Sequence, residues 1–208
     1  MEAVIDHLVF TAPSLEEGMS RIEEELGVRP VKGGQHPQWG TCNALLGLGE
    51  GMYLEVIARD PSLPEPEQGV PKIFAGGTQP RLATWAARSR NLERIRTIAG
   101  RARITLGEVI GGSRMRPDGE PLHWQLTDPF TSILHGVVPF FIDWGDSVHP
   151  SGLLPSGGKL RQLIVKHPFP GEASSVLADL GVEVAVHPSS QPGLMAVIDS
   201  PRGEVVLH

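Results

Sequence analysis

The sequence has few features that would cross-link the chain or attach it to a charged partner. Its single cysteine, Cys42, cannot form an intramolecular disulfide, which indicates a reducing compartment, so we expect a cytoplasmic protein. No run of lysine and arginine is present and the net charge is −6, so neither nucleic acid nor an anionic membrane is an expected partner. No apolar stretch reaches the length of about 18 residues that a transmembrane helix needs, and we therefore expect none.

Several chemical signatures are also missing. The sequence contains no glycine-rich phosphate loop, no CxxC pair and no G-x-S-x-G nucleophile elbow. It is instead rich in glycine (25) and proline (19), which predicts many turns and short elements. With 208 residues, of which 40% are hydrophobic, the chain can bury the core of one large domain or of two small ones.

A pattern of strand, helix and hairpin is present and occurs three times. In the first unit, residues 4–10 read as a strand, and a capping box at Ser14 begins a helix that Gly27 ends. A loop over residues 32–40 and a hairpin over residues 41–58 complete this unit. The second unit begins near Leu82, with a helix after Asn91 and a last strand over residues 137–144.

The third unit begins near Leu160, after a segment rich in proline, glycine and serine over residues 150–158. A strand, a helix over residues 172–180 and a final hairpin follow. The repeats predict an α+β fold of βαβββ modules that form curled, cup-shaped mixed sheets. We expect a paired domain over residues 1–150 and a third, partial module over residues 151–208, packed on the same domain.

His7 and Glu55 each lie within an otherwise apolar strand of the first unit. A buried histidine needs partners for its ring nitrogens, and a buried carboxylate needs a compensating charge or hydrogen bonds. A divalent metal ion would satisfy both side chains, and Zn, Ni, Mn, Co and Fe(II) accept such mixed ligands. A hydrogen-bonded His–Glu pair without a metal, or an arginine beside Glu55, would satisfy them equally.

Asp143 lies in the last strand of the second unit, where alternation places it with Phe141 on one face. It could be a third metal ligand or a general base. The alternative is a solvated carboxylate at a strand end that caps the next turn.

The densest polar cluster follows Gly33 and includes His36 and Asn43. His36 could serve as an acid, a base or a lid residue, and Asn43 could point into the cup and bind a carbonyl group. The alternative is a turn with a surface histidine. No organic cofactor is expected.

Two further residues are candidates for substrate binding. Arg114 could clamp a substrate carboxylate or neutralise Asp143, unless it forms a surface pair with Asp118. Trp124 is expected as an apolar wall. Histidines near loops and termini are expected at the surface: His135, His149, His167, His187 and His208.

Taken together, these motifs resemble the glyoxalase-like domain family of the vicinal oxygen chelate superfamily, which includes glyoxalases, bleomycin-resistance proteins and extradiol dioxygenases. The resemblance covers nearly the whole chain. It is carried by the opening strand with His7, the segment from His36 to Leu45, the strand with Glu55, and residues 116–119 and 139–144.

The resemblance implies a metal site that takes one residue from the first strand and one from the last strand of each module. Aligning the units by hand gives His7, Glu55, Thr84 and Asp143 at those positions. Thr84 is a poor replacement for the usual His or Gln, which leaves a three-ligand site of His7, Glu55 and Asp143, or a cup that binds no metal. The fold class is often dimeric, so a homodimer is expected.

The leading hypothesis is a metal-dependent lyase, isomerase or dioxygenase-type enzyme that acts on a small oxygenated molecule. Glu55, Asp143 or His36 would transfer protons, and Asn43 or Arg114 would orient the substrate. The rival hypothesis is a metal-free binding or drug-sequestering protein that holds an apolar ligand between Tyr53, Trp124, Phe141 and Trp144.

Overall fold

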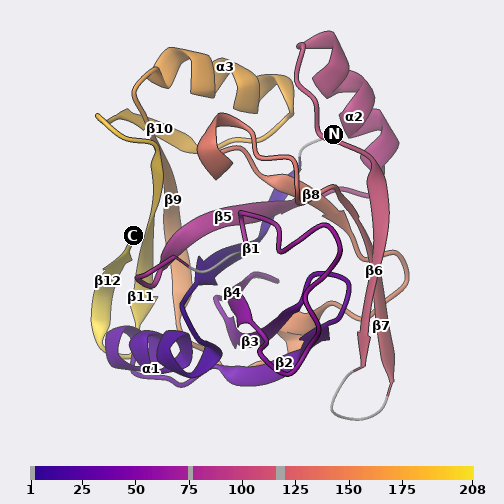
Figure 1. Ribbon diagram of the computed structural model, residues 1–208. Coiled ribbons are helices and arrows are strands. Elements are labelled where there is room, and N and C mark those ends of the chain that lie inside the picture. Colours follow the sequence, from indigo (N-terminus) through magenta and orange to yellow (C-terminus); the bar gives the residue numbers. More distant parts are fainter. Residues whose placement is uncertain (1–2, 75–76, 116–119) are drawn as a thin grey trace.

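The computed structural model describes residues 3–74, 77–115 and 120–208 (Figure 1). An eight-stranded sheet has the strand order β2-β3-β4-β1-β5-β8-β7-β6 and is strongly curled. Its strands are β1 (Val4–Thr11), β2 (Val31–His36), β3 (Thr41–Gly47), β4 (Tyr53–Arg59), β5 (Arg81–Arg88), β6 (Val109–Met115), β7 (Pro121–Thr127) and β8 (Phe140–Asp143).

The sheet consists of two modules with the same winding. In each module the first strand lies parallel to the last, β1 beside β4 and β5 beside β8. The two first strands, β1 and β5, pair antiparallel at the centre of the sheet. The predicted pair of βαβββ modules is therefore confirmed, and the curled sheet forms the expected cup.

Helices α1 (Leu15–Leu26) and α2 (Leu92–Arg101) begin where their capping residues predict. The Ser14 hydroxyl accepts a hydrogen bond from the Glu17 amide, and Gly27 ends α1 in the left-handed conformation with φ 80°. Asn91 caps α2 through a 2.9 Å bond from the Arg94 amide. Both helices pack apolar residues against the outer face of the sheet.

Residues from 159 onward form β9 (Lys159–His167), α3 (Pro170–Asp179), β10 (Ala185–Pro188), β11 (Gly193–Ser200) and β12 (Gly203–Leu207). The order of elements matches the prediction for a third unit. Its four-stranded sheet, however, has the order β10-β9-β11-β12, so its first strand lies parallel to its second and not to its last. The element order repeats along the chain, but the winding does not.

Alternation along the strands divides the buried side chains between two clusters. On β4, Leu54 and Val56 join the outer cluster beneath the helices, which also contains residues of β9, β11 and β12. Tyr53 and Ile57 join the inner cluster, which lines the cup. The sheet therefore has two apolar faces, and Glu55 lies on the inner one.

The expected loop over residues 32–40 is in part a strand, because β2 extends to His36 and pairs with β3. The pairing slips between Lys32 and Gln35, where the backbone accommodates a polar side chain from β3. A short 3-10 turn, η1 (Leu134–Gly136), precedes β8, and a second, η2 (Pro150–Leu153), follows it. No helix in the described part of the chain is long and apolar enough to cross a membrane.

Candidate functional site

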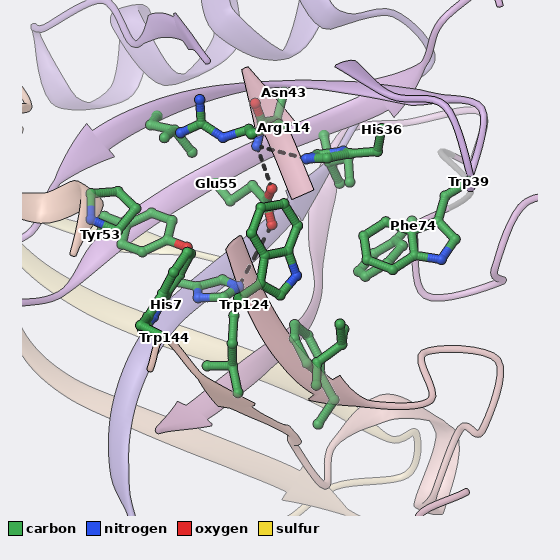
Figure 2. A pocket seen from close by; sticks show the side chains of 16 residues that line it. His7, His36, Trp39, Asn43, Tyr53, Glu55, Phe74, Arg114, Trp124 and Trp144 are labelled. Atoms are coloured by element: carbon green, nitrogen blue, oxygen red, sulfur yellow. Dashed lines mark hydrogen bonds and ion pairs between the residues drawn. The ribbon is translucent and has the colours of Figure 1, made fainter. Parts of the chain in front are cut away.

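The inner face of the curled sheet encloses a small cavity of about 30 Å³. That volume holds roughly two water molecules, so the lining side chains occupy most of the cup. The polar lining comes from β1, β2, β3, β4 and β6, and the aromatic lining adds side chains of β7, β8 and the connecting loops. The polar lining residues are His7, His36, Asn43, Glu55 and Arg114 (Figure 2).

His7 is held by its neighbour Asp6, although adjacent strand residues ordinarily point to opposite faces. The β1–β5 pairing slips between Ile5 and His7, and this irregularity brings the Asp6 carboxylate to His7. Asp6 Oδ1 lies 2.7 Å from His7 Nδ1, and both side chains are buried. Because the ionised carboxylate can only accept, Nδ1 carries a hydrogen, and Nε2 points to the Glu55 carboxylate.

From His7, a chain of polar contacts crosses the floor of the cup. His7 Nε2 lies 3.6 Å from Glu55 Oε2, and Asn43 Nδ2 donates to Glu55 Oε1 at 2.6 Å. The same amide nitrogen lies 3.5 Å from His36 Nε2, so the contacts run from His7 to His36 (Figure 2). Asn43 is itself oriented by the Gly34 amide, which donates to its Oδ1 at 2.9 Å.

His36 is buried at the far end of this chain. Its Nδ1 lies 3.1 Å from the Thr41 hydroxyl. Burial is the main cause that lowers the pKa of His36 to about 4; the charge of Arg114 acts in the same direction, and the carboxylate of Glu55 opposes the shift. His36 is therefore neutral at physiological pH, and it can offer a hydrogen bond or a lone pair but no charge.

Asp6 also binds three side chains other than His7. Its Oδ2 accepts a 3.1 Å hydrogen bond from Trp144 Nε1 and lies 3.0 Å from His149 Nε2 and 3.5 Å from Arg88 Nη1. Burial would raise the pKa of Asp6, but its hydrogen bonds with His149 and His7 hold that pKa well below the usual range. Asp6 is thus a permanent carboxylate shared by two histidines.

Aromatic rings form the walls around the polar floor. Tyr53 stacks on His7 with ring centroids 4.6 Å apart, and Phe140 meets the edge of the same imidazole at 5.5 Å. Burial raises the pKa of Tyr53 well above its usual range, with smaller contributions from Asp6 and Glu55, so its phenol stays protonated. The remaining aromatic lining consists of Trp39, Phe74, Trp124 and Trp144.

Arg114 lies at the rim, where the two ends of the sheet approach each other. Its Nη1 donates to the Gly33 carbonyl at 3.3 Å, which links β6 to β2 across the mouth of the cup. The guanidinium lines the cavity together with Asn43 (Figure 2). Its expected alternative partner, Asp118, lies outside the described residues.

Asp143 does not lie with His7 and Glu55, contrary to the metal-ligand and catalytic roles expected from the sequence. Its carboxylate accepts a 2.8 Å hydrogen bond from the Gly145 amide and caps the turn after β8. Phe140 and Ile142 point into the cup instead, while Phe141 points into the outer core. Alternation along β8 therefore assigns both Asp143 and Phe141 to the other face of the sheet.

The registers of the two modules show why the second one supplies no metal ligand. His7 pairs with Tyr53 in the first module, and Ala86 pairs with Phe140 in the second. Ala86 is thus the counterpart of His7, not Thr84, and Ile142 is the counterpart of Glu55. The second half of the implied metal site is therefore apolar.

The donors that remain do not fit a metal ion held by three or four protein ligands. His7 and Glu55 provide two donors, and the Asn43 amide lies between Glu55 and His36. Within residues 3–74, 77–115 and 120–208, no three His, Cys, Asp or Glu side chains converge to hold a metal. The set resembles an acid–base constellation more closely than a ligand set.

Most of the site residues predicted from the sequence lie around one cavity. They are His7, His36, Asn43, Tyr53, Glu55, Arg114 and Trp124. Asp6 was not among the predicted residues. His149, expected at the surface, is only partly exposed and contacts Asp6. His167, also expected at the surface, is buried. An acidic residue inside an apolar strand was the one available signal for Asp6.

Comparisons with known proteins agree with this architecture. The model of a family described as "Glyoxalase-like domain" matches residues 5–181. A search of the curated proteins gives no match. A crystal structure of a hypothetical protein from Staphylococcus aureus aligns with a TM-score of 0.68 at 14% identity, and the alignment covers 97% of this chain and 96% of that one.

Two structures of methylmalonyl-CoA epimerase align less closely. The enzyme from Mycobacterium tuberculosis gives a TM-score of 0.45 at 16% identity, covering 70% of this chain and 91% of that one. A variant of the Streptomyces coelicolor enzyme, in complex with 2-nitronate-propionyl-CoA, gives a TM-score of 0.45 at 13% identity. That alignment covers 72% of this chain and 100% of that one. At these identities the Staphylococcus aureus structure supports the fold alone.

Proposed function

The chain belongs to the glyoxalase-like domain family of the vicinal oxygen chelate superfamily, and on that basis we propose that it is an enzyme of isomerase or lyase type. It would bind a small oxygenated molecule in the cup and move a proton on a carbon beside a carbonyl group. The observation that carries this proposal is the buried Asp6–His7 pair, whose second ring nitrogen, Nε2, faces Glu55 inside the cavity.

The arrangement supports general acid–base catalysis for a physical reason. Asp6 fixes the orientation and tautomer of His7 and would stabilise the imidazolium formed when Nε2 takes a proton. Glu55, 3.6 Å from that nitrogen, could hold the same proton or return it to another atom of the substrate. His7 and Glu55 are thus assigned as the proton-transfer pair.

Two other residues could stabilise the negative charge that develops on the substrate oxygen. The Asn43 amide is fixed by Gly34, and Arg114 supplies a cation at the rim. The aromatic walls leave room for only roughly two water molecules, and exclusion of water strengthens such interactions. The proposal assigns no step to a metal ion, because the positions implied for metal ligands hold His7 and Glu55 in the first module but Ala86 and Ile142 in the second.

A second function has a specific observation in its favour. Six aromatic side chains line a cavity that the protein's own groups nearly fill: Trp39, Tyr53, Phe74, Trp124, Phe140 and Trp144. Such a lining would suit a protein that holds an apolar or aromatic ligand without changing it. That candidate predicts binding with no proton transfer.

Hydrogen exchange at carbon separates the two functions and can be measured on a panel of compounds. The protein would be incubated in D₂O with 2-oxo acids, hydroxyketones and diketones, and NMR would follow replacement of C–H by C–D. We expect exchange in at least one compound, and His7→Gln should slow it by roughly 100-fold or more. Asp143→Asn is the matched control and should leave the rate unchanged.

Three outcomes would count against the proposed enzyme. Equal exchange with wild-type and His7→Gln protein would remove His7 from the mechanism. Quenching of tryptophan fluorescence by compounds that undergo no exchange would favour the binding function. Exchange that disappears on dialysis against a chelator and returns with one divalent metal would restore the metal-dependent hypothesis.

A further inference from the structure

A second cavity of about 250 Å³ lies beside the cup. We propose that it binds the apolar tail of the molecule whose oxygenated head enters the cup, so that the ligand is an amphipathic anion. The inference rests on the proposed function only in placing the head of the ligand in the cup. The cavity, here called the groove, has as its apolar lining Val31, Leu45, Leu122, Val148, Leu153 and Leu154.

The groove and the cup adjoin. Leu45, Arg114 and Pro150 line both cavities, so the proposal places one molecule in both, with its head and tail meeting beside the Arg114 side chain. The cup alone, at about 30 Å³, is too small for a metabolite, whereas pockets that hold such ligands begin near 300 Å³. The two cavities together approach that size.

The groove is lined by apolar side chains that the fold leaves unusually open to solvent. Leu153 is 71% exposed and Val148 is 63% exposed, while Leu122 at the base of the groove is buried. Burying a leucine or valine side chain is worth about 1.5–3 kcal/mol, so exposed ones grouped around a cavity favour an apolar occupant.

The wall that carries these residues is fixed at both ends. His149 is anchored to Asp6 at 3.0 Å, immediately before η2. Beyond η2, the Gly47 amide donates to the Pro155 carbonyl at 2.9 Å, and Gly157 donates to the Gly47 carbonyl at 2.9 Å. A wall held in this way is formed before the ligand arrives, which lowers the entropy cost of binding.

Charge at the junction indicates that the oxygenated head of the ligand is anionic. Arg114 lines both cavities, and Lys32 lines the groove on the neighbouring strand. A guanidinium presents its N–H donors in a planar fork that matches a carboxylate, and the Arg114 side chain lines both cavities. A fatty acid or a related oxygenated acyl chain has this combination of groups.

A series of straight-chain carboxylates, from acetate to dodecanoate, provides the test. Trp124 and Trp144 line the cup, so quenching of tryptophan fluorescence reports binding. We expect the affinity to rise about three- to fourfold per added methylene until the groove is filled, and then to level off. Arg114→Gln should weaken binding of every member of the series roughly tenfold or more without changing the slope.

Groove variants supply the decisive comparison. The double variant Val148→Ser/Leu153→Ser should flatten the dependence on chain length, whereas Phe169→Ser, which changes an apolar residue 66% exposed outside the groove, should not. Affinity independent of chain length in the wild-type protein would overturn the proposal. An unchanged slope in the double variant would overturn it as well. If that variant also converted a dimer to a monomer, the groove would be an interface between two copies of the chain.

These outcomes are distinct from those that test the proposed function. If proton transfer fails, the carboxylates still bind with a chain-length dependence, and His7→Gln leaves that dependence intact. If the groove proposal fails, short oxygenated compounds still undergo exchange that depends on His7.

Discussion

Among individual residues, Asp6 connects more parts of the site than any of the residues expected from the sequence. One buried carboxylate orients His7 inside the cup, accepts a hydrogen bond from Trp144 in its wall, and anchors His149 at the start of the groove wall. Arg88 lies close enough to balance its negative charge, and the two histidines contact the carboxylate at hydrogen-bond distance. Loss of that charge should therefore lower the stability of the protein and disturb the orientation of His7 in the cup.

We predict that Asp6→Asn lowers the free energy of unfolding by about 2–4 kcal/mol at pH 7, because hydrogen bonds to a buried charge are lost. The folded-state pKa of Asp6 is lowered, so its contribution is present above the unfolded pKa near 4 and is lost as pH falls below it. Urea unfolding at a series of pH values measures both effects. The difference in unfolding free energy between the wild-type protein and the variant should become smaller below about pH 4. A difference that is independent of pH would contradict this account.

The lowered pKa of His36 predicts a second pH dependence of the free energy of unfolding, at higher pH than that of Asp6. Its folded pKa is about 4, whereas the unfolded chain takes up the proton near 6.5, so stability should fall by about 3 kcal/mol between those values on acidification. His36→Gln should remove this slope, as measured by urea unfolding between pH 8 and 4. The control, His187→Gln, changes an exposed histidine and should keep the slope.

The residues of the cup differ in how far the sequence could predict them. Asn43 and Glu55 stand in strands that pair regularly with each other, where alternation of side chains predicts the face correctly. His7 also lies on the predicted face, although its strand is irregular at that point. Asp6 could not be found in this way, because a slip in the β1–β5 pairing reorients it and depends on the partner strand. The prediction for Asp143 is wrong because alignment of the repeats along the sequence pairs Asp143 with Glu55. The strand registers show that Ile142 is the residue that corresponds to Glu55.

At the level of elements, β2 is shaped by a side chain from its neighbour. A Cβ added at Gly33 would lie 2.2 Å from Asn43 Oδ1, so only glycine leaves room for the amide that binds Glu55. The glycines that suggested a loop in the sequence instead allow an edge strand to close over Asn43. Composition alone cannot distinguish these two uses of glycine.

Gly33→Ala should therefore disturb the site as well as the strand. We expect a loss of about 1–3 kcal/mol in unfolding free energy, because Asn43 must move and Glu55 then loses its 2.6 Å donor. The matched control is Gly100→Ala in α2, where a Cβ meets nothing within 4 Å. That substitution should stabilise the protein by about 0.5–1 kcal/mol, through helix propensity. Thermal unfolding measures both, and similar effects at the two positions would contradict the close contact at Gly33.

The third unit shows how far element order can predict winding. Its strands, helix and hairpin were expected from turn and cap signals, and they are present. Its strand order differs from that of the two modules, because β9 pairs with β10 and β11 at the centre of a separate sheet. The pairing of strands depends on which sheet faces meet in the folded chain. The local periodicity of apolar residues does not specify this.

For the whole molecule, the third unit and the paired modules share one apolar core. Leu163, Ala196 and Ile198 of the four-stranded sheet belong to the same buried cluster as Leu8, Phe10 and Trp85 of the curled sheet. The Leu82 amide donates to the His208 carbonyl at 2.7 Å, and Ala3 forms a bridge with Val182. Separation of the two parts would expose this core to water.

We therefore predict that the chain unfolds in a single cooperative transition. All four tryptophans lie before residue 150, so their fluorescence reports on the curled sheet and, through Trp85, on the core that it shares with the third unit. Hydrogen exchange measured by mass spectrometry on peptides from β9 and β11 reports on the other part. Both signals should change at the same urea concentration, and a chain truncated after residue 158 should bind a hydrophobic dye and lose the sharp transition. Two separate midpoints, or a truncated chain that unfolds as sharply as the intact one, would mean that the paired modules are stable on their own.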